Sequence, residues 1–193
     1  MLFRSKKETL NLPNRITLLR IILVPIFMYF LLLKNNYNLF YEVFALIIFI
    51  IAAITDGLDG YLARKQKIVT KFGKIIDPLA DKLLITSALI SFVSIGEISA
   101  WIAIIIIGRE FAVTGLRVLA ASEGIVIAAS KWGKWKTNLQ IFAVIAVILD
   151  PDIIPLPFYL TDILLWLAVL VTIISGLDYF KKADIDFFQE DGK

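Results

Sequence analysis

The chain contains no cysteine and no histidine among its 193 residues. The absence of cysteine excludes disulfide bonds and thiolate chemistry. The absence of histidine means that any general base must be a carboxylate, a lysine or a tyrosine. The net charge is only +3, so the positions of the charges carry more information than their sum.

Apolar residues are abundant. They make up 59% of the chain and give it a mean hydropathy of +0.83, whereas a soluble domain contains roughly 45–50%. This composition predicts an all-α integral membrane protein. The basic first residues lead into Asn11-Leu-Pro-Asn14 and not into a short apolar core with a small-residue cleavage site, so we expect no cleavable signal peptide.

The apolar residues fall into runs that predict six transmembrane helices with short connections. A crossing helix needs about 20 residues, and the fifth run approaches that length only when it is extended back through Thr137. Pro25 within the first run and Pro151 before the last indicate a kink or a turn. We expect one membrane-embedded domain over residues 1–193, in which residues 1–15 form a cytoplasmic juxtamembrane segment. The predicted spans lie near residues 16–34, 40–58, 77–96, 98–120, 137–150 and 158–178.

The basic residues are distributed unevenly about these spans. All of the 20 Lys and Arg residues except Lys34 fall on one side of the predicted topology. The turns of the other side carry Glu97, Asp150 and Asp152. The positive-inside rule therefore predicts that both termini lie in the cytoplasm and that the protein is a multi-pass protein of the cell membrane. Topology and headgroup contact are a sufficient alternative explanation for the basic residues near the chain ends.

Four aspartates stand beside apolar runs on this cytoplasmic side. Asp56 and Asp59 end the second span, while Asp77 and Asp81 begin the third, and the spacing of each pair puts it on one helix face. If the two spans form an antiparallel hairpin, the pairs meet at one depth. Carboxylates there are costly and indicate function by default, and an all-oxygen cage suits one or two Mg²⁺ or Mn²⁺ ions. The alternative is that these acids cap helices or balance nearby bases.

Small residues and one arginine accompany the acids. Gly60 and Ala63 allow a ligand or a neighbouring helix to approach the backbone closely. Arg64 lies about one turn beyond Gly60 and can pair with a phosphate. Pro78 is suited to the first turn of a helix, so the third span is predicted to begin near Asp77.

This segment resembles the signature of the CDP-alcohol phosphotransferase family, D-x2-D-G-x2-A-R-x8-G-x3-D-x3-D, with no departure. The resemblance implies the fold of that family, which has six transmembrane helices in one catalytic domain and is usually a homodimer. The matching positions are Asp56, Asp59, Gly60, Ala63, Arg64, Gly73, Asp77 and Asp81.

The resemblance also implies roles for these residues. Asp56 and Asp77 would bridge two metal ions. Asp59 would complete one metal site and Asp81 the other, and Asp81 would also be the general base that deprotonates the acceptor alcohol. The residues implied to contact the donor, CDP-diacylglycerol, are Pro13, Asn14, Arg15, Gly60, Ala63, Arg64, Thr70 and Gly73.

A second informative segment contains Arg109 and Arg117, which lie near one face of a helix. Arg109 falls deep in the fourth predicted span, where an unpaired cation would cost several kcal/mol. Arg109 therefore needs an anion. That anion is Glu110, another nearby acid, or a phosphate in a water-filled cavity.

Lysines interleaved with tryptophans follow between residues 131 and 136. Trp132 and Trp135 suit an aromatic belt at the membrane interface, which is one explanation of the pattern. The other is suggested by the Gly-Arg-Glu-Phe, Thr-Gly-Leu-Arg and Gly-Lys-x-Lys-Thr runs and by the Leu-Pro-Asn-x-x-Thr-x-x-Arg start. These resemble the phosphatidylglycerophosphate synthases of the same family, and they imply sn-glycerol 3-phosphate as the acceptor. Its phosphate would be held by Arg109, Arg117, Lys134 and Lys136.

The expected reaction moves a phosphatidyl group from CDP-diacylglycerol to sn-glycerol 3-phosphate, giving phosphatidylglycerol phosphate and CMP. Within the family, inositol phosphate, serine or another lipid are alternative acceptors. Outside it, a divalent-cation transporter would distribute its acids through the membrane, which the clustering at one level disfavours. An intramembrane prenyltransferase would also use paired aspartates with Mg²⁺, but its donor lacks the nucleotide that Gly60, Ala63 and Arg64 fit.

Overall fold

The computed structural model describes residues 12–34, 39–66, 71–122, 131–149 and 159–182. Thr70, predicted to lie near the nucleotide, falls outside these ranges. At several other predicted site residues the structure describes the backbone of a helix but not the side chain. These are Pro13, Asp56, Asp59, Gly60, Ala63, Arg64, Asp77 and Lys134.

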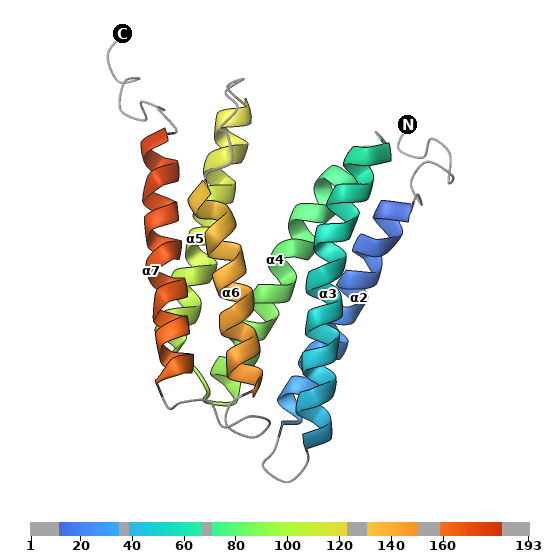
Figure 1. Ribbon diagram of the computed structural model, residues 1–193. Helices are drawn as coiled ribbons and strands as arrows, with labels where there is room; N and C mark the ends of the chain where they lie inside the picture. Colours follow the sequence, from blue (N-terminus) through green and yellow to red (C-terminus); the bar gives the residue numbers. More distant parts are fainter. Residues whose placement is uncertain (1–11, 35–38, 67–70, 123–130, 150–158, 183–193) are drawn as a thin grey trace.

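The described residues form α-helices and contain no strand, which confirms the all-α prediction. Figure 1 shows that successive helices run in opposite directions, so that α2 begins and α7 ends at the same end of the bundle. We call this end, where α4 also begins and α3 and α5 end, the motif end. The helices are α2 (Leu12–Leu32), α3 (Leu39–Gln66), α4 (Lys71–Ser94), α5 (Ala100–Ser122), α6 (Lys131–Leu149) and α7 (Leu160–Lys182).

Each predicted span falls on one helix, but the helices at the signature are longer than the apolar runs. α3 continues through the first half of the signature to Gln66, and α4 begins at Lys71 rather than near Asp77. Pro78 consequently lies inside α4 and not in its first turn. The physical reason is that a helix can continue where its residues turn polar, because its hydrogen bonds lie within its own backbone.

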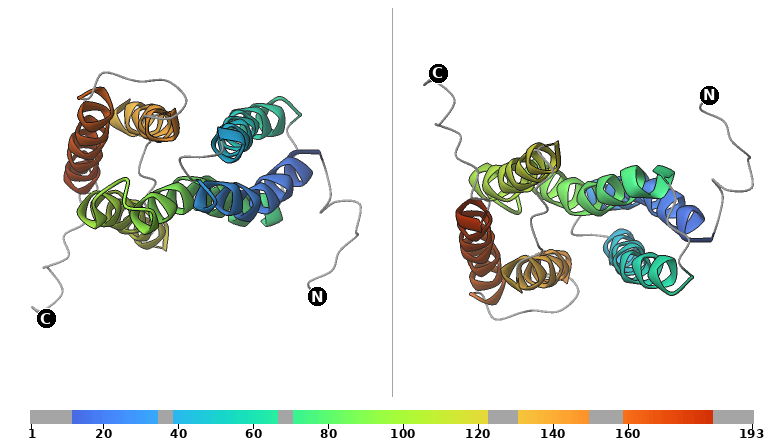
Figure 2. Two further views of the ribbon diagram at one scale, coloured as in Figure 1. Left: turned by 90° about the horizontal axis from the view of Figure 1, so that it is seen from below. Right: turned by 90° about the horizontal axis from the view of Figure 1, so that it is seen from above.

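The helices form two groups of three. In the first group α2 packs against both α3 and α4, and in the second α7 packs against both α5 and α6. Contacts of α4 with α5 and α6, and of α3 with α6, join the groups. The two views in Figure 2 show α5, α4 and α2 along one side of the molecule and α7, α6 and α3 along the other.

The surface of these helices is strongly apolar. Large side chains such as Tyr29, Trp101, Phe142 and Trp166 are exposed on different helices, and Trp101 is 75% exposed. A soluble monomer rarely exposes apolar patches on this scale, so the surface fits contact with lipid. In the described part of the chain, two helices are long and apolar enough to cross a membrane, Asn14–Leu32 and Leu160–Lys181. That all six helices cross stays a prediction.

A helix cap and an ion pair lie at the end opposite the motif end. Gly96 has a φ of 81° just after the end of α4. The amide of Gly96 donates to the Val93 carbonyl at 3.2 Å, and that of Glu97 to the Phe92 carbonyl at 2.9 Å, which is a Schellman cap. Glu97 then binds Lys34 with an Nζ–Oε1 distance of 3.0 Å. The one basic residue on this side of the predicted topology is therefore paired with an acid.

Candidate active site

The four signature aspartates occupy similar depths at the motif end. Asp56 stands about ten residues before the end of α3, and Asp81 about ten residues after the start of α4. At 1.5 Å per residue, each lies about 15 Å from its helix end. Since α3 and α4 run in opposite directions and contact each other, helix geometry puts all four positions near one level. Asp81 is the one whose side chain is described.

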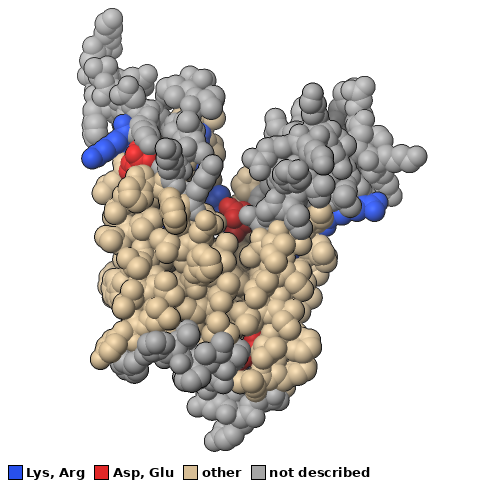
Figure 3. All heavy atoms as spheres, viewed as in Figure 1, with Lys and Arg blue, Asp and Glu red and all other residues tan. Residues whose placement is uncertain are grey.

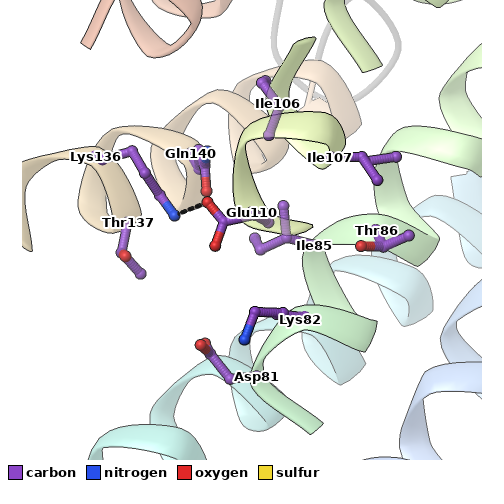
Figure 4. A pocket seen from close by; sticks show the side chains of 10 residues that line it. All are labelled: Asp81, Lys82, Ile85, Thr86, Ile106, Ile107, Glu110, Lys136, Thr137 and Gln140. Carbon is purple, nitrogen blue, oxygen red and sulfur yellow. Dashed lines mark hydrogen bonds and ion pairs between the residues drawn. The ribbon is translucent and has the colours of Figure 1, made fainter. Parts of the chain in front are cut away.

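Asp81 lines a pocket at the motif end that lies between the two helix groups. Figure 3 shows a hollow between the groups there, with acidic and basic atoms at its base. In Figure 4, Asp81 and Lys82 come from α4, Glu110 from α5, and Lys136 and other side chains from α6. The lining residues are Asp81, Lys82, Ile85, Thr86, Ile106, Ile107, Glu110, Lys136, Thr137 and Gln140.

Glu110 and Lys136, two of the lining residues, belong to a compact charge cluster that also includes Arg109. Lys136 Nζ donates to Glu110 Oε1, and Arg109 Nη1 donates to the same oxygen at 3.3 Å. The side chain of Lys136 is only 7% exposed and that of Arg109 only 11%. Asp81 and Lys136 both line the pocket. Glu110 is therefore an anion that Arg109 binds, as one of the sequence alternatives predicted.

The two arginines of α5 are held from the other side by α7. Arg109 Nη2 donates to Ser175 Oγ at 2.6 Å, and Arg117 Nη2 donates to the Tyr179 hydroxyl. The guanidinium carbons of Arg109 and Arg117 lie 5.4 and 4.8 Å from the centre of the Tyr179 ring. Cations at this distance are attracted to the ring face. Tyr179 therefore links both arginines to α7.

The structure separates the residues that the sequence grouped as one phosphate site. Lys136 lines the same pocket as Asp81, whereas Arg109 and Arg117 are not among the lining residues and contact α7. Arg109 still reaches the pocket indirectly through Glu110. Trp132 and Trp135 are both exposed, which fits the alternative that they are interface anchors.

The start of α2 brings further polar groups to the motif end. Asn14, one of the predicted donor contacts, is buried, whereas Arg15 is exposed. Thr17 and Arg20 are buried as well, so a buried polar residue occurs at every third position from Asn14 to Arg20. α2 packs against α3 and α4, so this polar face is turned toward the two signature helices. Gly73, another predicted donor contact, is buried near the start of α4.

Sequence reasoning did not select Ser175, Tyr179, Thr17 or Arg20 as site residues. Thr17 and Arg20 carried a usable signal, because they continue the polar spacing of Asn14 along an otherwise apolar helix. Ser175 and Tyr179 carried none, because a serine or a tyrosine at the end of an apolar run does not indicate a partner on another helix.

The contact between α5 and α7 is tight at Gly176, which leads to a prediction. A methyl group added at Gly176 would lie 3.2 Å from Arg109 Cγ, whereas one added at Gly115 would meet nothing within 4 Å. We expect Gly115→Ala to raise stability by up to about 1 kcal/mol, because alanine favours the helix. Gly176→Ala should be less stable than Gly115→Ala by about 1–3 kcal/mol through overpacking. Thermal unfolding in one detergent measures both, and equal midpoints would contradict the tight contact.

The lipid-compatible helical bundle, with carboxylates and cations at one end, fits a membrane-associated enzyme that acts on phosphate groups. The sequence profile of the CDP-alcohol phosphatidyltransferase family matches residues 10–174. The chain belongs to this family, a family of transferases, which confirms the resemblance seen in the signature. This membership favours the transferase over the cation transporter and the prenyltransferase.

Several curated relatives are similar to this chain over most of its length. A CDP-diacylglycerol–glycerol-3-phosphate 3-phosphatidyltransferase of Bacillus subtilis is 47% identical, with 89% of this chain and 94% of the relative covered. A protein of the same name from Rickettsia typhi is 41% identical, with 89% of this chain and 96% of the relative covered. A probable phosphatidylglycerophosphate synthase of Mycobacterium tuberculosis is 40% identical, with 90% of this chain and 81% of the relative covered.

Proposed function

We propose that the chain transfers the phosphatidyl group of CDP-diacylglycerol to sn-glycerol 3-phosphate, forming phosphatidylglycerol phosphate and releasing CMP. Relatives named for this reaction, 47% and 41% identical over most of the chain, support both substrates. The structural observation that carries the proposal is the shared pocket of Asp81 and Lys136. A carboxylate and a buried cation share this pocket, and an alcohol that bears a phosphate requires a base for its hydroxyl and a cation for its phosphate.

The reaction needs an alkoxide to attack the phosphorus atom that bears the diacylglycerol. Asp81 accepts the proton of the acceptor hydroxyl, the new P–O bond forms, and the bond to the CMP oxygen breaks. Lys136 holds the acceptor phosphate so that the hydroxyl lies next to Asp81. Much of the barrier is lowered by such placement, because a bimolecular step becomes effectively intramolecular.

The donor set of the signature fits Mg²⁺ or Mn²⁺. Four carboxylate positions lie near one level on two adjacent helices, and oxygen ligands without histidine or cysteine suit these hard cations. We propose that Asp56, Asp59, Asp77 and Asp81 hold one ion or two. Divalent cations supply charge neutralisation for the diphosphate and for the leaving CMP.

We further propose that the donor lies over the first helix group. Gly60, Ala63 and Arg64 belong to α3 and Gly73 belongs to α4, and both helices pack against α2, which carries the buried polar face. Pro13, Asn14 and Arg15 start α2 at the same end, and Thr70 follows α3 in the chain. The acceptor would then enter from the second group, which contributes Lys136.

The membrane arrangement is also part of the proposal. α2 begins and α7 ends at the motif end, and the long apolar stretches of these two helices suit membrane crossing. Six crossings with both termini and the active site in the cytoplasm agree with the distribution of Lys and Arg. A homodimer stays a prediction from the family resemblance.

An acceptor panel tests the function directly. We expect CMP release from CDP-diacylglycerol with sn-glycerol 3-phosphate, and rates lower by at least roughly tenfold with inositol phosphate, serine or glycerol. Serine and glycerol lack the phosphate, and inositol phosphate has a ring in place of the glycerol chain. Chelation by EDTA should abolish release, and Mg²⁺ or Mn²⁺ should restore it. The measurement is CMP formation by the purified full-length chain in mixed micelles. Release with inositol phosphate but not with sn-glycerol 3-phosphate would refute the acceptor.

A further inference from the structure

Glu110 occupies an unusual place for an acid in this pocket. One of its oxygens, Oε1, accepts hydrogen bonds from both Lys136 Nζ and Arg109 Nη1. These cations come from α6 and from α5 itself, and all three side chains are less than one-fifth exposed. The carboxylate thus lies where two buried cations converge, on the wall of the pocket that also contains Asp81.

The other polar groups of this wall are already engaged with the protein. Gln140 Nε2 donates to Thr172 Oγ1 at 3.1 Å, and Thr137 Oγ1 donates to the Gly133 carbonyl at 3.2 Å. Two cations are among the described lining residues of the pocket. Lys82 Nζ donates to the Pro78 carbonyl of its own helix at 3.3 Å, and Lys136, on the wall with Gln140 and Thr137, is already bound by Glu110.

Charge decides which ligands can compete with Glu110. A carboxylate carries one negative charge, whereas a phosphate monoester carries about 1.5 to 2 charges at neutral pH and three strong acceptor oxygens. A phosphate can therefore take Lys136 from Glu110, while a neutral polyol cannot. A zwitterion such as serine brings only one carboxylate, together with an ammonium group that the neighbouring cations repel.

We propose that Glu110 is a built-in competitor of the acceptor phosphate and thereby a specificity-determining residue. In the empty pocket it neutralises Lys136 and Arg109, and a phosphate-bearing acceptor displaces it from Lys136. Unphosphorylated alcohols leave the Lys136–Glu110 ion pair intact and bind poorly. This inference rests on the proposed function, specifically on Lys136 as the ligand of the acceptor phosphate.

The variant Glu110→Gln tests the inference through the sign of the change in KM. Removal of the competing charge should lower the KM for sn-glycerol 3-phosphate roughly three- to tenfold. This range lies between the contribution of an exposed ion pair to binding and that of a buried hydrogen bond to a charged group. The KM for CDP-diacylglycerol should stay unchanged. A merely structural Glu110, which only orients Lys136, predicts the opposite sign, so a raised KM for the acceptor would overturn the proposal.

A binding measurement serves as a second readout that does not depend on turnover. Inorganic phosphate should raise the thermal unfolding temperature of Glu110→Gln more than that of the unchanged protein. The phosphate concentration that inhibits the variant should also be lower, by the same factor as the decrease in KM. If Glu110→Gln fails to fold, Glu110→Asp takes its place, because the shorter carboxylate weakens the contact with Lys136 while keeping the charge. That variant should show a smaller decrease in KM, and an increase would count against the proposal.

Two controls separate the inference from the function on which it rests. Glu97→Gln removes an acid that binds Lys34 at the opposite end of the bundle, and it should leave the KM for the acceptor unchanged. Lys136→Gln tests the acceptor site itself. If Lys136→Gln leaves the acceptor KM unchanged, the placement of the acceptor phosphate fails. If Lys136→Gln raises that KM and Glu110→Gln raises it too, the competitor role alone fails.

Discussion

Replacement of Asp81 by asparagine is expected to reduce turnover by about 10²–10⁴-fold, the usual contribution of a general base. Asparagine has nearly the same shape but cannot accept the proton of the acceptor hydroxyl. Asp81 is exposed toward the pocket, so the substitution should leave the helical bundle intact. The measurement is the rate of CMP release at saturating concentrations of both substrates, together with thermal unfolding to verify the fold.

A matched control exists on α7. Asp162 is exposed in the first turn of that helix, at the end opposite the motif end. Asp162→Asn changes the same chemical group and should leave turnover within roughly twofold, as expected for a surface substitution. Near-full activity of Asp81→Asn would show that another group removes the proton, and the assignment of Asp81 as the base would be wrong.

The second large effect is expected at Lys136. Lys136→Gln removes a buried cation from the pocket of Asp81. A hydrogen bond to a charged group contributes about 1.5–3 kcal/mol, so the KM for sn-glycerol 3-phosphate should rise roughly ten- to a hundredfold. The KM for CDP-diacylglycerol should change little, because the proposed donor contacts lie on α2, α3 and α4. Initial rates with each substrate varied in turn measure the two constants.

Lys181 provides the control for this charge. It is exposed near the end of α7, so Lys181→Gln changes the net charge by the same amount without touching the pocket. Its acceptor KM should equal that of the unchanged protein. If both variants raise the acceptor KM equally, the effect is a general electrostatic attraction of the anion, and Lys136 has no specific contact with the phosphate.

The helices could be predicted from the apolar runs, and the depth of the acids from the signature. The apolar runs did not indicate that α3 continues to Gln66 and that α4 begins at Lys71. Hydropathy reports where a chain can meet lipid, whereas helix continuation depends on backbone hydrogen bonds that polar residues also allow. The second and third predicted spans were therefore located on the right helices, but the end of α3 and the start of α4 were predicted wrongly.

The candidate site could be predicted in part for a similar reason. Signature spacing indicated Asp81, and charge indicated Arg109, Arg117 and Lys136. Neither the spacing nor the charge indicated that Lys136 shares the pocket of Asp81 while the two arginines contact α7. That division depends on how α5, α6 and α7 pack, and a serine or a tyrosine in an apolar span carries no sign of its partner.

The ion pair between Lys34 and Glu97 also bears on the order in which the protein is completed during synthesis. Lys34 follows α2, whereas Glu97 follows α4, so the pair can form only after the chain has been made past the Schellman cap. The ends of α2 and α4 are therefore joined by a residue that is synthesised after the first three helices. A nascent chain that ends at Ser94 would contain the whole first group and yet lack this contact.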